Sequence, residues 1–147
     1  MQSLLVNDDE SIIRMTFSPE SYQDGEFLPS AVSLDDLKAR GFSVDRESIT
    51  TLAVVRERIE TQQQKKPEDR HFPIFSKLSC AAIRAEAAEY QQTMFVVEAF
   101  PDGKNDGHAV IKSAIPRGKG ELRKLRNRLI QHLNNVVPLE SLQFPEG

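Results

Sequence analysis

The clearest hydrophobic pattern in this chain is the alternation along Ser11–Ser18, which predicts a half-buried β-strand. A period of two residues places successive side chains on opposite faces of a sheet. One face of this strand carries Ile13, Met15 and Phe17, and the other carries Ile12, Arg14 and Thr16.

Two further apolar runs, Met94–Phe100 and Ala109–Ile115, flank a polar loop. Val, Phe and Ile fill the runs, while Pro, Gly, Asn and Asp fill the gap, as in a strand–loop–strand unit. His108 stands where the loop re-enters the second strand, a position at which a rigid scaffold presents a polar side chain. The other polar side chains of the loop are Asp102, Lys104, Asn105 and Asp106.

Helical periodicity predicts three longer helices, over about 48–64, 77–91 and 121–134. The first has one apolar stripe, and the second is rich in alanine, which favours helix. The third has leucines at spacings of three, four and four residues: Leu122, Leu125, Leu129 and Leu133.

Capping signals indicate where helices begin and end. Ser33 and Asp36 resemble a capping box, and Gly41 supplies the left-handed residue that ends the short helix after it. Asp45 or Ser48 is expected to cap the helix over 48–64.

The remaining segments are connections. Segment 61–73 is polar and contains Pro67, so we expect a mobile loop there. Residues 136–147 contain two prolines and are expected to form an irregular C-terminal strap. Together the elements predict a single α+β domain over residues 1–147, with a small, mainly antiparallel sheet packed against amphipathic helices.

Composition agrees with one globular domain: the chain has 147 residues, 28% of them charged and 39% hydrophobic. Its one cysteine, Cys80, lies in the alanine-rich helix, where a buried thiol acts as a small hydrophobe; a thiol nucleophile paired with His108 is the alternative. The N-terminus lacks the basic and apolar regions of a secretory signal, and no apolar run is long enough to cross a bilayer. We therefore expect a cytoplasmic protein without membrane contact.

The net charge of −3 hides a basic segment near the C-terminus. Between Lys119 and Arg128 five basic residues stand against one acid, so this segment carries +4 and the rest of the chain −7. Arg123, Lys124 and Arg128 lie opposite the leucines and are the candidate partner-binding residues. Nucleic acid is the alternative partner of segment 119–132, but no aromatic interleaving, zinc-finger spacing or helix-turn-helix signal accompanies the basic residues.

The loop before the last strand raises the question of a metal or general-base site. The calcium-loop pattern is missing, and zinc needs further His or Cys nearby, so we expect no metal and no cofactor. His108 is the candidate catalytic acid or base. In the alternative account, Asp and Asn side chains make turn hydrogen bonds to their own backbone and His108 begins a strand.

An anion site is the second candidate. Ser43 and Arg46, with Asn105 and Asp106 of the loop, are the candidate ligand-binding residues. If Arg46 points at His108, the two side chains share a pocket and Arg46 clamps a phosphate or carboxylate.

Three short motifs carry a resemblance: LPSAV at 28–32, GFSVDR at 41–46 and NDGHAVI at 105–111. Followed by a leucine-spaced helix, they resemble a scattered set of small prokaryotic proteins with the approximate pattern P-x-A … S-V-x-R … N-x-x-H-A-x-I. The resemblance spans most of Leu28–Leu133. It implies a bacterial or archaeal cytosolic protein in which Ser43, Arg46 and His108 form one set, and it implies no particular activity.

Two classes of function remain open. No complete catalytic constellation appears, which favours a non-catalytic protein-interaction or accessory subunit of a prokaryotic multi-gene system, for example in defence or a toxin–antitoxin pair. The alternative is a small hydrolase or transferase acting on a phosphorylated or nucleotide-like substrate, with His108 as acid/base and Arg46 as anion clamp.

Overall fold

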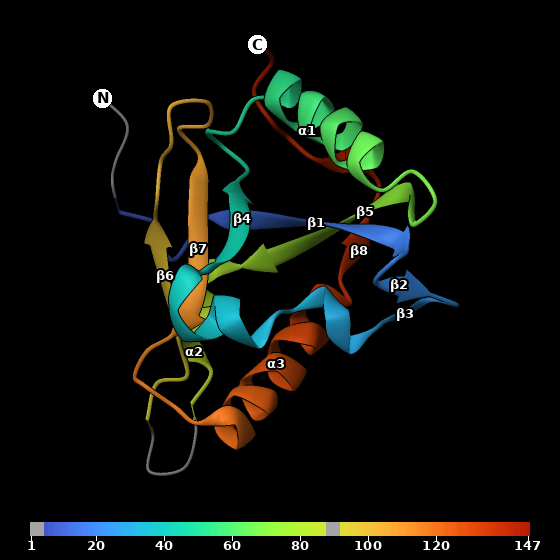
Figure 1. Cartoon of the computed structure of the whole chain (residues 1–147). Helices are drawn as coiled ribbons and strands as arrows, with labels where there is room; N and C mark the ends of the chain where they lie inside the picture. The colour runs from blue at the N-terminus through green and yellow to red at the C-terminus, as the bar shows by residue number, and fades with distance from the viewer. Residues whose placement is uncertain (1–4, 88–91) are drawn as a thin grey trace.

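A six-stranded antiparallel sheet forms the centre of the computed structural model, which describes residues 5–87 and 92–147 (Figure 1). The strand order is β6–β7–β4–β1–β5–β8. These strands are β1 (Ser11–Pro19), β4 (Phe42–Arg46), β5 (Arg70–Ser79), β6 (Phe95–Ala99), β7 (His108–Ser113) and β8 (Val136–Val137). A separate hairpin pairs β2 (Tyr22–Gln23) with β3 (Glu26–Phe27). The predicted α+β class is confirmed, as is the strand–loop–strand unit, which is the β6–β7 hairpin.

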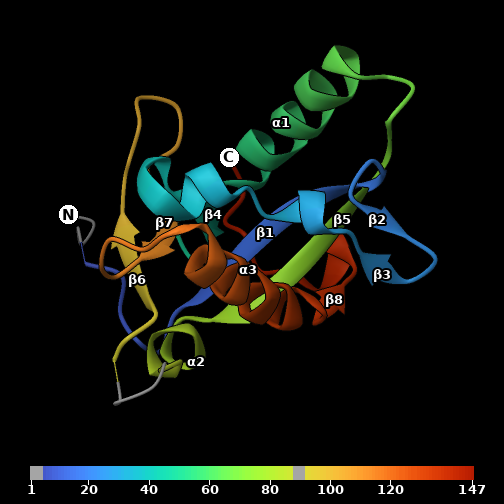
Figure 2. The ribbon, with the colours of Figure 1, turned by 60° about the horizontal axis from the view of Figure 1, so that its bottom comes forward.

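Helices cover both faces of this sheet. The α-helices are α1 (Leu52–Lys65), α2 (Cys80–Ala85) and α3 (Lys119–Leu133), and the short turns are η1 (Pro29–Ala31), η2 (Asp36–Arg40) and η4 (Leu139–Ser141). Figures 1 and 2 show α1 and α3 on opposite sides of β1 and β5. Within the described ranges, no helix is long and apolar enough to cross a membrane.

Strand β1 is buried on both faces, so the expectation of a half-buried strand is wrong. Ile12 packs in the larger core with α2 and α3, while Ile13 packs in a smaller core with α1 and the C-terminal segment. A central strand between two helical layers loses most of its solvent face, so Thr16 on that face is buried and Arg14 is partly buried.

The sheet separates between β1 and β4. Strand β1 pairs with β5 from Ser11 to Pro19, but with β4 only at Ile12 and Ile13. Strand β4 continues instead alongside β7, and Figure 1 shows β4, β7 and β6 running across the direction of β1 and β5. An opening between β1 and β4 follows from this divergence.

The prediction of a helix over 77–91 is wrong for its first three residues. Residues up to Ser79 belong to β5, and the helix is limited to α2, while residues 88–91 of the prediction lie outside the described part of the chain. Pro73 obscured this strand in the sequence. It is tolerated because β8 pairs with β5 only at Phe75 and Ser76, which leaves β5 an edge strand at Pro73.

The expected loop over 61–73 is also mostly regular. Helix α1 continues to Lys65 and β5 begins at Arg70, so the connection itself is four residues long, 66–69. The residue that caps α1 is Thr51, whose Oγ1 accepts a hydrogen bond from the Val54 amide at 3.3 Å, rather than Asp45 or Ser48. Asp45 lies inside β4.

The ends of the short helix η2 and the C-terminal segment agree with the sequence predictions. Ser33 Oγ accepts a hydrogen bond from the Asp36 amide at 3.4 Å, and Gly41 ends η2 with a φ of +92°. Residues 136–147 form β8, η4 and irregular backbone that crosses to α1, where the Leu52 amide donates to the Pro145 carbonyl at 2.7 Å. Phe144 of this segment is buried against Val55.

Candidate functional site

His108 and Ser43 meet across neighbouring strands. Asp45 of β4 is paired with His108 of β7, which places Ser43, two residues before Asp45, on the same face as the imidazole. The His108 Nδ1 lies 2.7 Å from the Phe100 carbonyl oxygen, which can only accept, so Nδ1 donates. In the neutral ring Nε2 then accepts from the Ser43 hydroxyl, 3.1 Å away. Both ring nitrogens are therefore engaged, and the ring also lies edge-on to Phe100.

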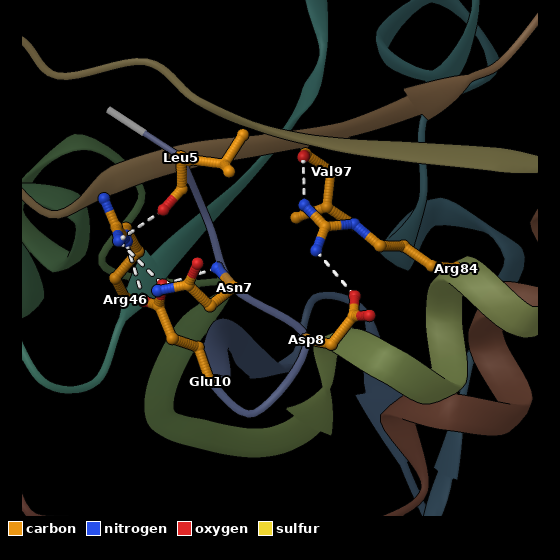
Figure 3. Close-up of polar contacts among 7 residues, drawn as sticks. All are labelled: Leu5, Asn7, Asp8, Glu10, Arg46, Arg84 and Val97. Atoms are coloured by element: carbon orange, nitrogen blue, oxygen red, sulfur yellow. Dashed lines mark hydrogen bonds and ion pairs between the residues drawn. The ribbon is translucent and has the colours of Figure 1, made fainter. Parts of the chain in front are cut away.

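Arg46 does not join this pair, so the predicted Arg46–His108 anion clamp is wrong. Because neighbours along a strand point to opposite faces, Arg46 lies on the face opposite His108. Its guanidinium is 3% exposed and binds both carboxylate oxygens of Glu10, at 2.8 and 2.7 Å, and the Leu5 carbonyl at 3.1 Å (Figure 3). Arg46 thus holds the N-terminal segment against the sheet.

A second arginine, Arg84, also binds the N-terminal segment. Arg84 of α2 donates to the Asp8 carboxylate at 2.8 Å and to the Val97 carbonyl of β6 at 2.9 Å (Figure 3). Together, Arg46 and Arg84 connect residues 5–10 to three elements that are distant in the sequence.

The loop residues make turn hydrogen bonds, as the alternative account of this loop expects. Asn105 is 4% exposed; its Nδ2 donates to Asp45 at 2.9 Å, and its Oδ1 accepts from Thr50 at 3.0 Å and from the Gly107 amide at 2.9 Å. Asp102 accepts from the backbone amides of Lys104 and Asn105, which together lower the pKa of its carboxyl group despite the opposing effect of burial. Asp106 is exposed, and neither it nor Asn105 lines the cleft described next.

A polar cleft of about 670 Å³ opens where β1 and β4 separate. Ser43 and His108 line it from the β4–β7 side, and Arg14 and Thr16 line it from β1. Its charged side chains are the cations Arg14, Arg58, Lys66 and Arg70 and the carboxylates Glu20, Asp45 and Asp102.

Three of the four cations have a carboxylate partner. Arg58 pairs with Asp45 at 2.6 Å, and Arg70 and Lys66 pair with Glu20 at 3.0 and 3.4 Å. Arg14 differs: among the described residues it forms no ion pair. Burial lowers the pKa of Arg14 to about 10, although the charges of Asp36 and Asp45 act to raise it.

The outer face of α3 is the other candidate surface. The four leucines of the predicted stripe are buried, which confirms the helix and its inward face. Arg123 and Lys124 are exposed, and Lys124 forms an i,i+3 ion pair with Glu121 at 3.6 Å. Arg128 pairs with Glu86 at 2.9 Å.

The remaining candidate chemistry has no support in the described ranges. Cys80 is fully buried and burial raises the pKa of its thiol, opposite to what a thiolate nucleophile needs. No group of three or more His, Cys, Asp or Glu side chains in residues 5–87 and 92–147 is arranged to hold a metal ion.

No family model, curated protein or solved structure matches this chain, so its own geometry carries the functional argument.

Sequence reasoning missed Arg14, Thr16, Arg58 and Arg70 as site residues. The available signal was Arg14, a charged residue in the middle of an otherwise apolar strand. The alternation pattern assigns such a residue to a polar face, and its contacts with Ser43 and Phe42 of β4 appear only in the folded structure.

The Glu10–Arg46 pair makes stability depend on pH. Burial acts to raise the pKa of Glu10, but hydrogen bonds from Arg46 and the Asn7 amide, with the charges of Arg46 and Arg84, leave it below its ordinary value of 4.5. Because the folded pKa is the lower one, this contribution is complete above pH 4.5 and is lost as the pH falls through the folded value.

We predict that Glu10→Gln lowers the free energy of unfolding by about 3 kcal/mol at neutral pH, since it removes the carboxylate that binds the buried Arg46 guanidinium through both of its oxygens. The difference in unfolding free energy from the unsubstituted protein shrinks as the pH falls below 4.5, the ordinary pKa of a glutamate. Urea unfolding at a series of pH values measures both effects. Glu57→Gln, at an exposed position of α1, is the control; a Glu10→Gln effect no larger than that of Glu57→Gln contradicts the prediction.

Proposed function

We propose that this protein is a non-catalytic accessory subunit of a prokaryotic multi-gene system and binds an acidic partner protein through the outer face of α3. The exposed cations of this face carry the proposal. Arg123 and Lys124 are exposed on a helix whose leucines are buried in the core, and charges at such exposed positions contribute little to folding. A local basic surface on a chain of net charge −3 instead suits electrostatic recognition of an acidic protein.

The engagement of His108 supports a non-catalytic role for the loop. Its Nδ1 is bound to the Phe100 carbonyl and its Nε2 to Ser43, so the ring ties the end of β6 to β4 across β7. Asn105 and Asp102 likewise use their polar atoms within the fold. These groups order the loop without requiring a substrate.

We predict that the double substitution Arg123→Glu and Lys124→Glu abolishes partner binding and changes the free energy of unfolding by less than about 1 kcal/mol. A triple variant adds Arg128→Gln, which removes the third candidate residue. Glutamine is used there because a glutamate would lie next to Glu86, the partner of Arg128, and would be repelled by it. Affinity capture with quantitative mass spectrometry, using each form as bait in a lysate of the source organism, measures the loss of binding.

A matched control is Arg56→Glu with Lys65→Glu, the same change of charge at exposed positions of α1. The proposal expects proteins that are captured by the unsubstituted and α1-substituted baits and lost with the α3-substituted bait. Equal capture by all three baits contradicts it, and a large loss of stability in the α3 variant assigns these side chains a structural role.

The Ser43–His108 contact favours a second candidate function: a small hydrolase or transferase acting on a phosphorylated or nucleotide-like substrate. A serine hydroxyl within 3.1 Å of an imidazole nitrogen is the arrangement of a nucleophile and its base, and both side chains line the cleft. In this version His108 is the acid/base, and Arg14 or Arg58 replaces Arg46 as the cation nearest the substrate.

The substitution His108→Asn separates the two functions. As a structural side chain, His108 can be replaced at a cost of about 1 kcal/mol in stability, with partner capture retained. As an acid/base, its loss lowers turnover by roughly 10²–10⁴-fold with the fold intact. A screen of the purified protein against nucleotides and phosphoesters, run beside this variant and Ser43→Ala, decides: turnover that both variants lose overturns the accessory role.

A further inference from the structure

Arg14 is the cation of the cleft that forms no ion pair among the described residues, although the charges of Asp36 and Asp45 act on it. Its Nη1 donates to the Ser43 carbonyl at 2.9 Å, and its guanidinium carbon lies 4.1 Å from the centre of the Phe42 ring. Its Nε is buried without a hydrogen-bond partner among the described residues. A carbonyl and a ring face offer only partial negative charge, so the full positive charge of Arg14 is not neutralised within the described fold.

Thr16 presents a second unpaired donor in the same place. It lies two residues after Arg14 on the same face of β1, it is 5% exposed, and it lines the same cleft. Its hydroxyl is buried without a partner among the described residues. Buried polar groups are nearly always hydrogen-bonded, and those that are not often mark a functional site. Two such side chains on one strand, at a cleft, therefore point to a ligand that carries acceptor oxygens.

The net charge of the residues that line the cleft indicates which charge a ligand with acceptor oxygens should carry. Four cations and three carboxylates line it, so its lining carries a net charge of +1. Arg14 is the cation without an ion pair among the described residues, since Asp45 pairs with Arg58 and Glu20 pairs with both Lys66 and Arg70. A singly charged group matches this excess. A second negative charge on the same group would be repelled by the carboxylates of Glu20, Asp45 and Asp102. The planar fork of a guanidinium also fits the two oxygens of a carboxylate.

We propose that this cleft is a binding site for a carboxylate ligand, with Arg14 as its counter-charge and Thr16 as a second hydrogen-bond donor. The volume of about 670 Å³ accommodates a small organic acid or the C-terminal end of a peptide. The site is independent of the α3 surface and does not require turnover at Ser43 and His108.

The test is an NMR titration of the ¹⁵N-labelled protein at constant ionic strength, with sodium chloride replaced by the probe. The probes are sodium lactate, tetra-alanine with a free C-terminus, tetra-alanine amide and sodium phosphate. We expect saturable shifts of the Arg14 Nε–H and the Thr16 amide, with a dissociation constant on the order of millimolar, from lactate or from the free peptide. The amide produces none, and the two carboxylate arms identify the source of the ligand.

Variants connect the shifts to the proposed groups. Arg14→Met is expected to abolish saturation, Arg14→Lys to weaken binding about tenfold because the fork is lost, and Thr16→Val to weaken it several-fold. Arg56→Met, at an exposed position of α1, leaves the dissociation constant unchanged. The dispersion of each variant's spectrum checks its folding, and Thr16→Val carries the test if Arg14→Met does not fold.

Three results overturn the proposal. The first is a linear response to every salt, with no saturation at Arg14 from either carboxylate probe. The second is tighter binding of phosphate than of both carboxylates, which assigns the cleft to a different ligand class. The third is saturation that persists unchanged in both Arg14→Met and Thr16→Val.

Discussion

The separation of β1 from β4 after Ile13 is the constraint on which the rest of this structure depends. Two residue pairs hold these strands together, while β1 follows β5 along its whole length and β4 follows β7. The sheet therefore consists of two groups of strands running in different directions, with helical layers on both faces. The cleft and the position of Arg14 beside it result from this divergence.

Buried ion pairs hold the two groups of strands at defined positions. Glu10, just before β1, binds Arg46 at the end of β4, and Asp45 binds both Arg58 of α1 and Asn105 of the β6–β7 loop. Removing one member of such a pair is costly because the other charge stays buried. The fold thus satisfies most of its enclosed charges internally. Arg14 is the exception among the cations of the cleft, since it forms no ion pair among the described residues, and this exception is the basis of the proposed ligand site.

Much of the fold could be predicted from local pattern. Helix α3, the β6–β7 hairpin and the Gly41 turn were predicted because a leucine spacing, two β-branched runs and one glycine each specify a local conformation. Strand β5 could not be predicted in this way, since Pro73 and its polar ends resemble a loop. It pairs with residues of β1 that lie 51 to 68 positions earlier in the chain, from Pro19 opposite Arg70 to Ser11 opposite Ser79.

The candidate site was predictable only in part for the same reason. His108 was identified from its place at the end of a polar loop and Ser43 from a second polar element, and the two side chains do meet. The hypothesis that Arg46 points at His108 is wrong because Arg46 binds Glu10, which is 36 residues away. Arg14 was assigned to a polar face because alternation within one strand cannot show that its guanidinium lies against Ser43 and Phe42 of another strand.

The ligand-free stability of Arg14→Met tests most directly the claim that this cation is not compensated by the fold. An apolar side chain of similar length removes a desolvated charge and leaves Phe42 covered, so the account predicts a free energy of unfolding in urea that is unchanged or up to about 2 kcal/mol higher. The same substitution at the paired Arg46 lowers it by about 3 kcal/mol. A comparable loss at Arg14 would contradict the account, because it would show that the charge of Arg14 serves folding rather than a ligand.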